Sequence, residues 1–224
     1  MRGFLIITLS LLISSFTFSQ SIDVESWTKD IDFYKTNLEQ HHIDLYNTIS
    51  KVEFEKEIQE IKSTLNKKND VEVIVDLMRL TRKIGDGHTA FSLRSVETHL
   101  FPIEIYKING QWRVIKTTNS HKNLLGKIVS KIDGKSIHLI ANEVSEIAQY
   151  VENEQSKIIR TGEYCMISEL LFGLQLINNE FKAEFSFLDD SNKESNILLN
   201  AINNKDYYGN TDFETFKIVI PEIQ

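Results

Sequence analysis

The hydrophobic periodicity of this chain changes once, at a short glycine-flanked turn, and this change constrains the fold more than any other feature. Before the turn, apolar residues such as Trp27, Ile31 and Tyr34 recur at helical spacing. After it, apolar and polar residues alternate, as around Phe101 and Ile103. A helix repeats every 3.6 residues and a strand every two. The sequence therefore predicts an α+β fold in which a helical segment precedes a mixed module of strands and helices.

Three helices are expected before the turn. The first runs from Ser26, and the second opens with Ser50 followed by Glu53, a capping-box pattern. The third begins near Asn69 and ends at Gly85, the position of a C-cap glycine. Their apolar stripes predict that the three helices pack together.

Two hairpins are expected after the turn, at Asn109-Gly110 and Asp133-Gly134, because such dipeptides favour two-residue turns between strands. Helical spacing returns at residues 137–147 and again around residues 167–174. Alternation over residues 181–187 predicts a half-buried strand. The rest of the chain reads as a loop and one last strand in "FKIVIPEIQ".

The first twenty residues have the layout of a secretory signal peptide. Arg2 is the only charge, Gly3 to Phe18 is largely apolar, and Ser19 and Gln20 close the segment. A membrane anchor is the alternative, but the apolar run is short for a span and contains several serines and threonines. The sequence therefore predicts a secreted or periplasmic protein, with residues 1–20 as signal peptide and no membrane span after its cleavage.

Composition excludes several classes of partner. The formal charge of −7 and the pI near 5.4 argue against a nucleic-acid or anionic-membrane surface, because both need a basic patch. The lone Cys165 cannot form an internal disulfide. No metal or cofactor motif is present, so no cofactor is expected. The sequence says nothing about the oligomeric state.

The turn itself, in "LTRKIGDGHTAF", is the sharpest candidate for chemistry. A chain with nine glycines in 224 residues places Gly85 and Gly87 on either side of Asp86, and His88 follows. Glycine serves where the backbone needs positive φ or close approach, so the turn is expected to aim Asp86 and His88. The alternative is structural: Asp86 caps the turn and His88 bonds to the backbone.

A nucleophile is harder to find. Ser26 and Lys29 have the S-x-x-K spacing of some acyl-serine enzymes, but no companion motif follows, and chance explains it better. Cys165 has no basic neighbour and is expected to be a small core residue. His41 and His42 lie on different faces of a helix and are interpreted as a surface pair at its end.

Four stretches in one order resemble the tail-specific, or C-terminal processing, serine peptidase family, in the tricorn-like branch. They are "HHIDLY", "RLTRKIGDGHTAF", "FPIEIYKINGQWRVI" and "LLGKIVSKIDGKSI". The last of them is similar to the carboxylate-binding region and following strands of a PDZ-like module. The resemblance covers roughly residues 25 to 200 and implies a helical domain at 21–95, a PDZ-like domain at 96–200, and a tail at 201–224 that leads toward a catalytic domain.

In the tricorn-like branch the histidine of this turn is the general base, so the resemblance makes His88 the candidate catalytic residue. The residue before it is often a catalytic serine, but here it is Gly87. The domain with the nucleophilic serine is expected only about where Gln224 ends the sequence. A truncated product, a pseudoenzyme and a half that joins a separate catalytic chain all fit. PDZ-like modules bind peptide or protein C-termini by strand addition, which implies peptide binding as the remaining capacity, with a non-peptide-binding adaptor as the alternative.

Overall fold

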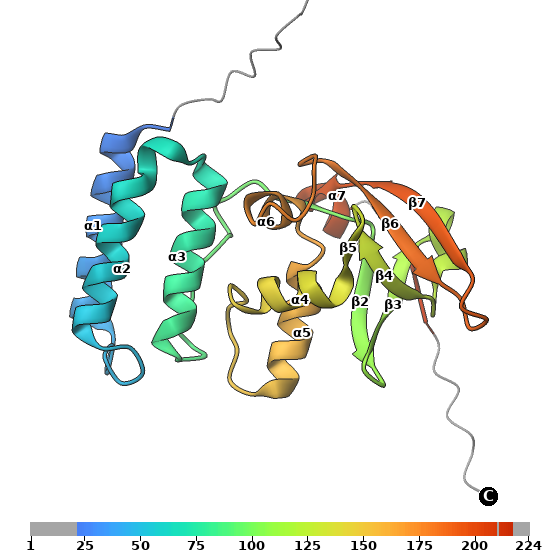
Figure 1. Ribbon diagram of the computed structural model, residues 1–224, viewed down its shortest axis with the longest axis horizontal. Helices are drawn as coiled ribbons and strands as arrows, with labels where there is room; N and C mark the ends of the chain where they lie inside the picture. The colour runs from blue at the N-terminus through green and yellow to red at the C-terminus, as the bar shows by residue number, and fades with distance from the viewer. Residues whose placement is uncertain (1–21, 210, 217–224) are drawn as a thin grey trace, which may run out of the picture.

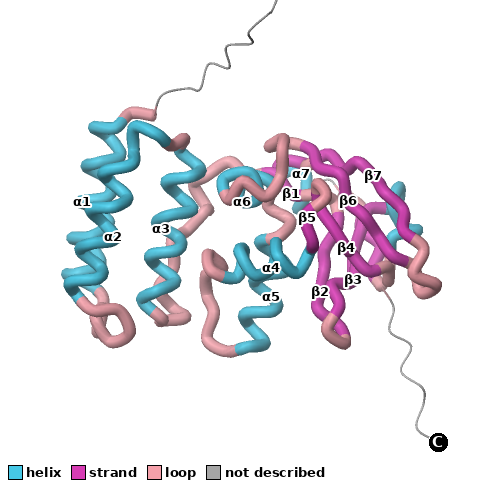
Figure 2. Tube along the Cα trace, viewed as in Figure 1, coloured by secondary structure: helices cyan, strands magenta, loops and turns pink. Residues whose placement is uncertain are grey.

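The computed structural model of the protein describes residues 22–209 and 211–216 and has a mixed α and β fold (Figure 1). Three helices stand side by side at one end of the molecule, and an antiparallel sheet lies at the other (Figure 2). The expected α+β class is therefore confirmed. The expected signal peptide at 1–20 lies outside the described residues.

The helices are α1 (Val24–His41), α2 (Lys51–Thr64), α3 (Asp70–Ile84), α4 (Ile137–Ser145), α5 (Glu154–Tyr164), α6 (Ser168–Gly173) and α7 (Asn204–Gly209), with short 3₁₀ helices η1 (Leu65–Lys67) and η2 (Asn119–Leu124). The strands are β1 (His99–Leu100), β2 (Ile103–Ile108), β3 (Gln111–Thr118), β4 (Ile128–Ile132), β5 (Lys135–Ser136), β6 (Lys182–Leu188), β7 (Glu194–Asn200), β8 (Ile202–Asn203) and β9 (Phe213–Thr215). We call residues 22–84 the helical segment, and residues 99–209 with 211–216 the sheet module.

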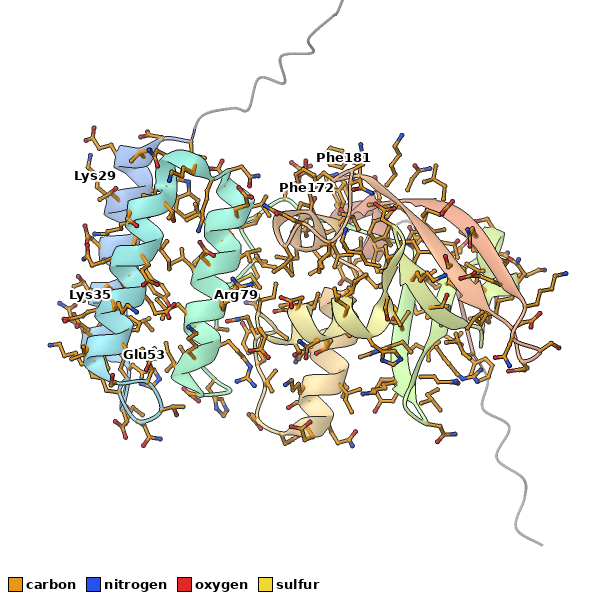
Figure 3. The ribbon with its side chains drawn as sticks, in the orientation of Figure 1. Lys29, Lys35, Glu53, Arg79, Phe172 and Phe181 are labelled. Carbon is orange, nitrogen blue, oxygen red and sulfur yellow. The ribbon has the colours of Figure 1, made fainter. Side chains whose placement is uncertain are left out.

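Side-chain caps fix where the three helices of the helical segment begin. Asp23 accepts the backbone N–H groups of Glu25 and Ser26 at the start of α1. Ser50 accepts the N–H of Glu53 at the start of α2. The Asn69 side chain and Glu72 form a full capping box at the start of α3. All three expected helices are confirmed. Charged side chains such as Lys29 and Glu53 project from the solvent side of this segment (Figure 3).

The main sheet has the order β2-β3-β4-β6-β7 with antiparallel pairing throughout, while β5 pairs with β4 and β9 with β3. Both expected hairpin turns are confirmed. Asn109 and Gly110 have φ of 50° and 81°, and Asp133 and Gly134 have φ of 45° and 76°. Two successive positive φ values give the type of turn whose twist matches antiparallel strands.

Each part of the molecule has its own hydrophobic core. In the helical segment, the core includes Phe54 and Ile58, whereas the sheet module buries Phe185 and Phe187 between its strands and helices. A smaller cluster joins the two parts, because Met78 of α3 packs with Ile147 and Leu170 of the sheet module. The turn after α3 therefore lies where two separately packed parts meet.

Several elements differ from the sequence-based expectation. The helix α5 was not expected, although Asn153 and Ser156 form a capping box at its start. Strand β7 was also missed, and residues 204–209, expected as loop, form α7. The expected last strand in "FKIVIPEIQ" falls on residues 216–224, of which 217–224 lie outside the described residues. Upstream of it, β8 pairs with β1 and β9 pairs with β3, so residues 202–209 and 211–215 belong to the sheet module.

Candidate functional site

The GDGH turn, Gly85 to His88, begins where α3 ends. Gly85 has φ of +77°, and its N–H donates to the carbonyl of Arg82, which closes the helix. The Asp86 carboxylate then accepts the backbone N–H of His88 at 3.0 Å and the hydroxyl of Thr89 at 2.7 Å. Asp86 therefore holds the turn together through bonds to residues two and three positions ahead.

The two glycines of the turn allow other loops to come close. A Cβ at Gly85 would lie 2.7 Å from Oγ1 of Thr48, in the loop between α1 and α2. A Cβ at Gly87 would lie 2.2 Å from Cγ of Glu152, in the loop between α4 and α5. These separations are far below ordinary carbon contact distances. The glycines thus serve close approach on both sides of Asp86, and the turn contacts both parts of the molecule.

His42 belongs to this site, contrary to the expectation of a surface pair. Its side chain is only 9% exposed, and its Nε2 lies 3.3 Å from Oδ2 of Asp86. The angle is not that of a hydrogen bond, so the contact is electrostatic. Its Nδ1 accepts the backbone N–H of Asp44, which leaves the proton of a neutral imidazole on Nε2, facing Asp86. His41, the other member of the pair, is exposed.

His88 stands on the surface between two carboxylates. Its side chain is 86% exposed, with Nδ1 3.6 Å from Oδ1 of Asp86 and Nε2 3.6 Å from Oε1 of Glu152. Among the described residues, no hydroxyl or thiol is hydrogen-bonded to the ring. The arrangement places an exposed imidazole between two carboxylates and brings no nucleophile to it.

The Asp86 carboxyl is ionised at neutral pH, because its pKa lies below the ordinary value of an aspartate. The backbone N–H of His88 has the largest effect in lowering the pKa of this carboxyl, followed by the Thr89 hydroxyl, and the nearby His42 and His88 lower it further. Hydrogen bonds to the charged form stabilise that form. Asp86 therefore acts as a fixed negative charge between two imidazoles.

Gln149 links the turn region to the sheet module and has no signal in the sequence pattern. It is 1% exposed, and its amide nitrogen donates to the carbonyls of Met78 and Ile147 at 3.0 and 2.7 Å. Its amide oxygen accepts the N–H of Phe91 at 2.9 Å. One side chain thereby satisfies backbone groups from three segments, which fixes the position of the chain after His88.

The other candidate groups take no part in a site. The hydroxyl of Ser26 donates to Asp23, and Lys29 pairs with Glu25, so this serine and lysine serve the helix start. Cys165 is fully buried, which raises the pKa of its thiol, and the expected core role is confirmed. In residues 22–209 and 211–216, no group of three or more metal-binding side chains could hold a metal ion. Within the same ranges, no helix is long and apolar enough to cross a bilayer.

The helix α5 lies alongside β2, an edge strand of the main sheet (Figure 1). A Cβ at Gly162 would fall 2.5 Å from the backbone carbonyl oxygen of Ile105, and Gln155 accepts a hydrogen bond from the Tyr106 hydroxyl. The close approach to a backbone carbonyl of this edge strand indicates that α5 covers the edge of β2. A peptide could add to β2 only if α5 moved away.

Comparison with known proteins gives a structural likeness without a sequence family. No family model matches the chain, and no curated protein sequence matches it. Three solved structures of CPAF, a chlamydial serine protease, do match. The fold is similar to that of part of CPAF. Mature CPAF complexed with lactacystin has a TM-score of 0.59 at 8% identity, and mature CPAF has 0.59 at 10%. A mutant form has 0.57 at 11%.

These matches cover 80 to 83% of this chain but only 35 to 36% of CPAF. The chain therefore spans about a third of the length of the proteases it is similar to. The likeness is distant and rests on the fold alone.

Proposed function

We propose that this chain is a secreted, protease-related binding protein of the tail-specific family, in the tricorn-like branch. On this proposal it has no peptidase activity by itself and binds the C-terminal segment of peptides through a PDZ-like module. The observation that carries the proposal is the open edge of β7. Within the described residues, β7 pairs with β6 alone, whereas α5 covers β2 at the opposite edge.

An open strand edge presents unpaired N–H and C=O groups, which is the surface that an extended peptide needs for strand addition. Leu198 of β7 is 58% exposed and offers an apolar contact beside that edge. The order of two hairpins followed by α4 supports the PDZ-like assignment, because the motifs that carry the resemblance lie on β2, β3, β4 and β5.

A titration with six- to eight-residue peptides ending in an apolar residue tests peptide binding. We expect saturable binding that is lost on amidating the C-terminus and on N-methylating alternate backbone nitrogens. Leu198→Glu should weaken binding by about tenfold through the lost apolar contact. The matched control is Leu139→Glu, because Leu139 is 51% exposed on α4, and it should bind normally. If none of the peptides binds, the chain is an adaptor domain that takes no peptide, which is the alternative that the covered β2 edge favours.

The surroundings of the His88 ring support the absence of peptidase activity. A serine-type hydrolase needs its nucleophile within hydrogen-bond reach of the base, and the groups near the His88 ring are carboxylates. The purified chain should not cleave unstructured peptides above background, and should not react with fluorophosphonate probes. Labelling of Ser26 would revive the S-x-x-K interpretation and overturn this part of the proposal.

The exposure of His88 favours a second candidate, in which the turn supplies the general base of a site whose serine comes from another polypeptide region. The open side of an 86% exposed imidazole leaves room for such a partner. In that case, adding a nucleophile-bearing chain from the same source should produce activity that His88→Ala abolishes.

Secretion is tested separately: intact-mass analysis of exported protein should find Gln20 or Ser21 at the N-terminus, and retention of Met1 would contradict it.

A further inference from the structure

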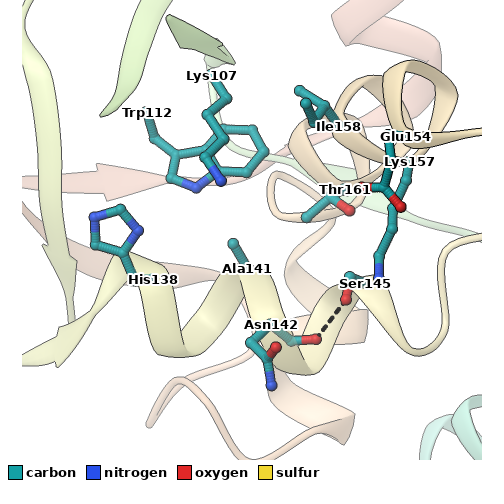
Figure 4. Close-up of a pocket in the computed structure, with 10 residues that line it drawn as sticks. All are labelled: Lys107, Trp112, His138, Ala141, Asn142, Ser145, Glu154, Lys157, Ile158 and Thr161. Carbon is teal, nitrogen blue, oxygen red and sulfur yellow. Dashed lines mark hydrogen bonds between the residues drawn. The ribbon is translucent and has the colours of Figure 1, made fainter. Parts of the chain in front are cut away.

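The main sheet ends at two strands, β2 and β7, and these strands differ in what lies beside them (Figure 1). The helix α5 lies alongside β2, and Lys107 of β2 and Ile158 of α5 line one pocket of about 230 Å³ between the two elements (Figure 4). At the other end of the sheet, β7 pairs with β6 alone among the described residues. The outer edge of β7 therefore presents backbone N–H and C=O groups that have no strand partner in the described part of the chain.

The edge of β7 lacks the features that usually keep strand edges apart. Such edges are commonly very short, bent by a bulge, interrupted by proline or marked by lysine. β7 has 7 residues, Glu194–Asn200, and pairs with β6 without a register shift, whereas the β2–β3 and β4–β6 pairs each contain one. Its sequence, ESNILLN, contains neither proline nor lysine. Its one charged residue, Glu194, lies at the end of the strand and pairs with Lys131 at 3.0 Å. β7 is therefore a regular edge that can accept another strand.

The sequence of β7 is compatible with antiparallel pairing to a second copy of itself. With a twofold axis at Ile197, Glu194 lies opposite Asn200, and Asn196 lies opposite Leu198. The only charged residue of each strand then faces a neutral amide, so like charges do not meet. Ile197 faces its own copy, and the exposed Leu198 side chains become diagonal neighbours on the solvent face. No other twofold register pairs the whole strand, because Ile197 is its central residue.

We propose that two copies of this chain pair through their β7 edges, antiparallel and about a twofold axis at Ile197, to form one sheet that continues across the dimer. The interface is small because it rests on one strand from each copy, so we expect a dissociation constant of about 10 μM. The paired edge is closed to peptide. This last consequence rests on the proposed function, whereas the pairing itself does not.

Sedimentation velocity of the purified chain tests the pairing, at concentrations from about tenfold below to about tenfold above the expected constant. We expect the average mass to rise from that of one chain toward that of two. Leu198→Lys should weaken the dimer by at least about tenfold, because the twofold axis brings two lysines close together. The matched control Leu139→Lys changes an exposed leucine of α4 and should pair as the parent does. A parent chain that stays monomeric throughout would overturn the proposal, as would a dimer that Leu198→Lys leaves unchanged.

A cysteine cross-link tests the register and does not depend on the lysine variant. Cys165 is fully buried, so it does not compete with an introduced thiol. Ile197→Cys should give a disulfide-linked dimer on oxidation, because residues directly opposite in an antiparallel pair bring their Cβ atoms to about 4.5–5.5 Å. The control Ile159→Cys places the thiol at an exposed isoleucine of α5 and should remain monomeric on a non-reducing gel. Equal behaviour of the two variants would contradict pairing about Ile197.

An excess of a six- to eight-residue peptide with an apolar C-terminus separates this inference from the proposed function. If both hold, the peptide shifts the sedimentation of the parent chain from dimer to monomer. A dimer that the peptide leaves intact would support the pairing and contradict peptide addition at β7. A monomer that binds the peptide would overturn the pairing and support the proposed function.

Discussion

The Nε2 atom of His42 lies 3.3 Å from Oδ2 of Asp86, so the end of α1 is held to the turn after α3 by an imidazole and a carboxylate. His42 directly follows α1 and Asp86 lies in the turn after α3, and Asp86 in turn holds the backbone of His88. The helical segment therefore holds in place the turn that carries the exposed imidazole of His88.

Replacing His42 tests this relationship. His42→Ala should cost about 1 to 3 kcal/mol, because Asp44 loses the acceptor for its N–H and a largely buried ring is removed. The matched control is His41→Ala, which removes an exposed imidazole one position earlier and should cost no more than about 0.5 kcal/mol. Urea unfolding of the two variants measures the difference, and equal costs would contradict the role of His42.

The stability of the turn should depend on Gly85 and Asp86 far more than on His88. His88→Ala should change the free energy of unfolding by no more than about 0.5 kcal/mol, because the ring is 86% exposed. Gly85→Val should cost about 1 to 3 kcal/mol or more, since φ is +77° and the new Cβ would meet Thr48 at 2.7 Å. Thermal unfolding decides the order, and a large loss for His88→Ala would make the histidine a structural residue.

The lowered pKa of Asp86 predicts a dependence of stability on pH. A carboxyl whose pKa is lower in the folded state adds stability above its unfolded value, near 3.8, and that stability is lost as pH falls through the folded pKa. Asp86→Asn should therefore be less stable than the parent at pH 7, by about 1 kcal/mol, and the difference should shrink below about pH 4. A difference that stays constant from pH 7 to pH 2.5 would show that charge is not involved.

The contact between α5 and β2 predicts that even a methyl group at position 162 lowers the stability of the fold. Gly162→Ala would place a Cβ 2.5 Å from the carbonyl oxygen of Ile105, which is backbone and cannot swing away. We expect a loss of about 1 to 3 kcal/mol, even though alanine favours helix more than glycine does. Gly209→Ala is the control, because no heavy atom lies within 4 Å of its new Cβ. If both variants match the parent in chemical unfolding, α5 is not held against β2.

Burial of Cys165 predicts an unreactive thiol. Its raised pKa and full burial should leave it unlabelled by a disulfide reagent in the native protein at pH 8, although an ordinary exposed thiol reacts there within minutes. In urea the same thiol should react completely. Fast labelling without urea would place Cys165 in a segment that opens readily.

The sequence by itself determined the helices of the helical segment and both hairpins, because their signals are local. Asn69 with Glu72 caps α3, and Asn109-Gly110 fixes a hairpin, each within a few residues. The helix α5 escaped prediction because its apolar residues are few and do not form a clear stripe, and its buried face is made by Thr161 and Gly162. The formation of α5 therefore depends more on packing against β2 than on a hydrophobic pattern within the helix.

The site was decided by tertiary structure. The turn motif indicated Asp86 and His88, and Asp86 does carry the hydrogen bonds of the turn. His42 and Glu152 reach the turn from other loops, and Gln149 holds the chain after the turn through a hydrogen bond from Phe91 that spans 58 positions. No periodicity or short motif encodes such contacts, because they arise only when two separately packed cores meet. Whether a histidine is buried beside a carboxylate, as His42 is, or exposed, as His41 is, depends on what the rest of the chain packs around it.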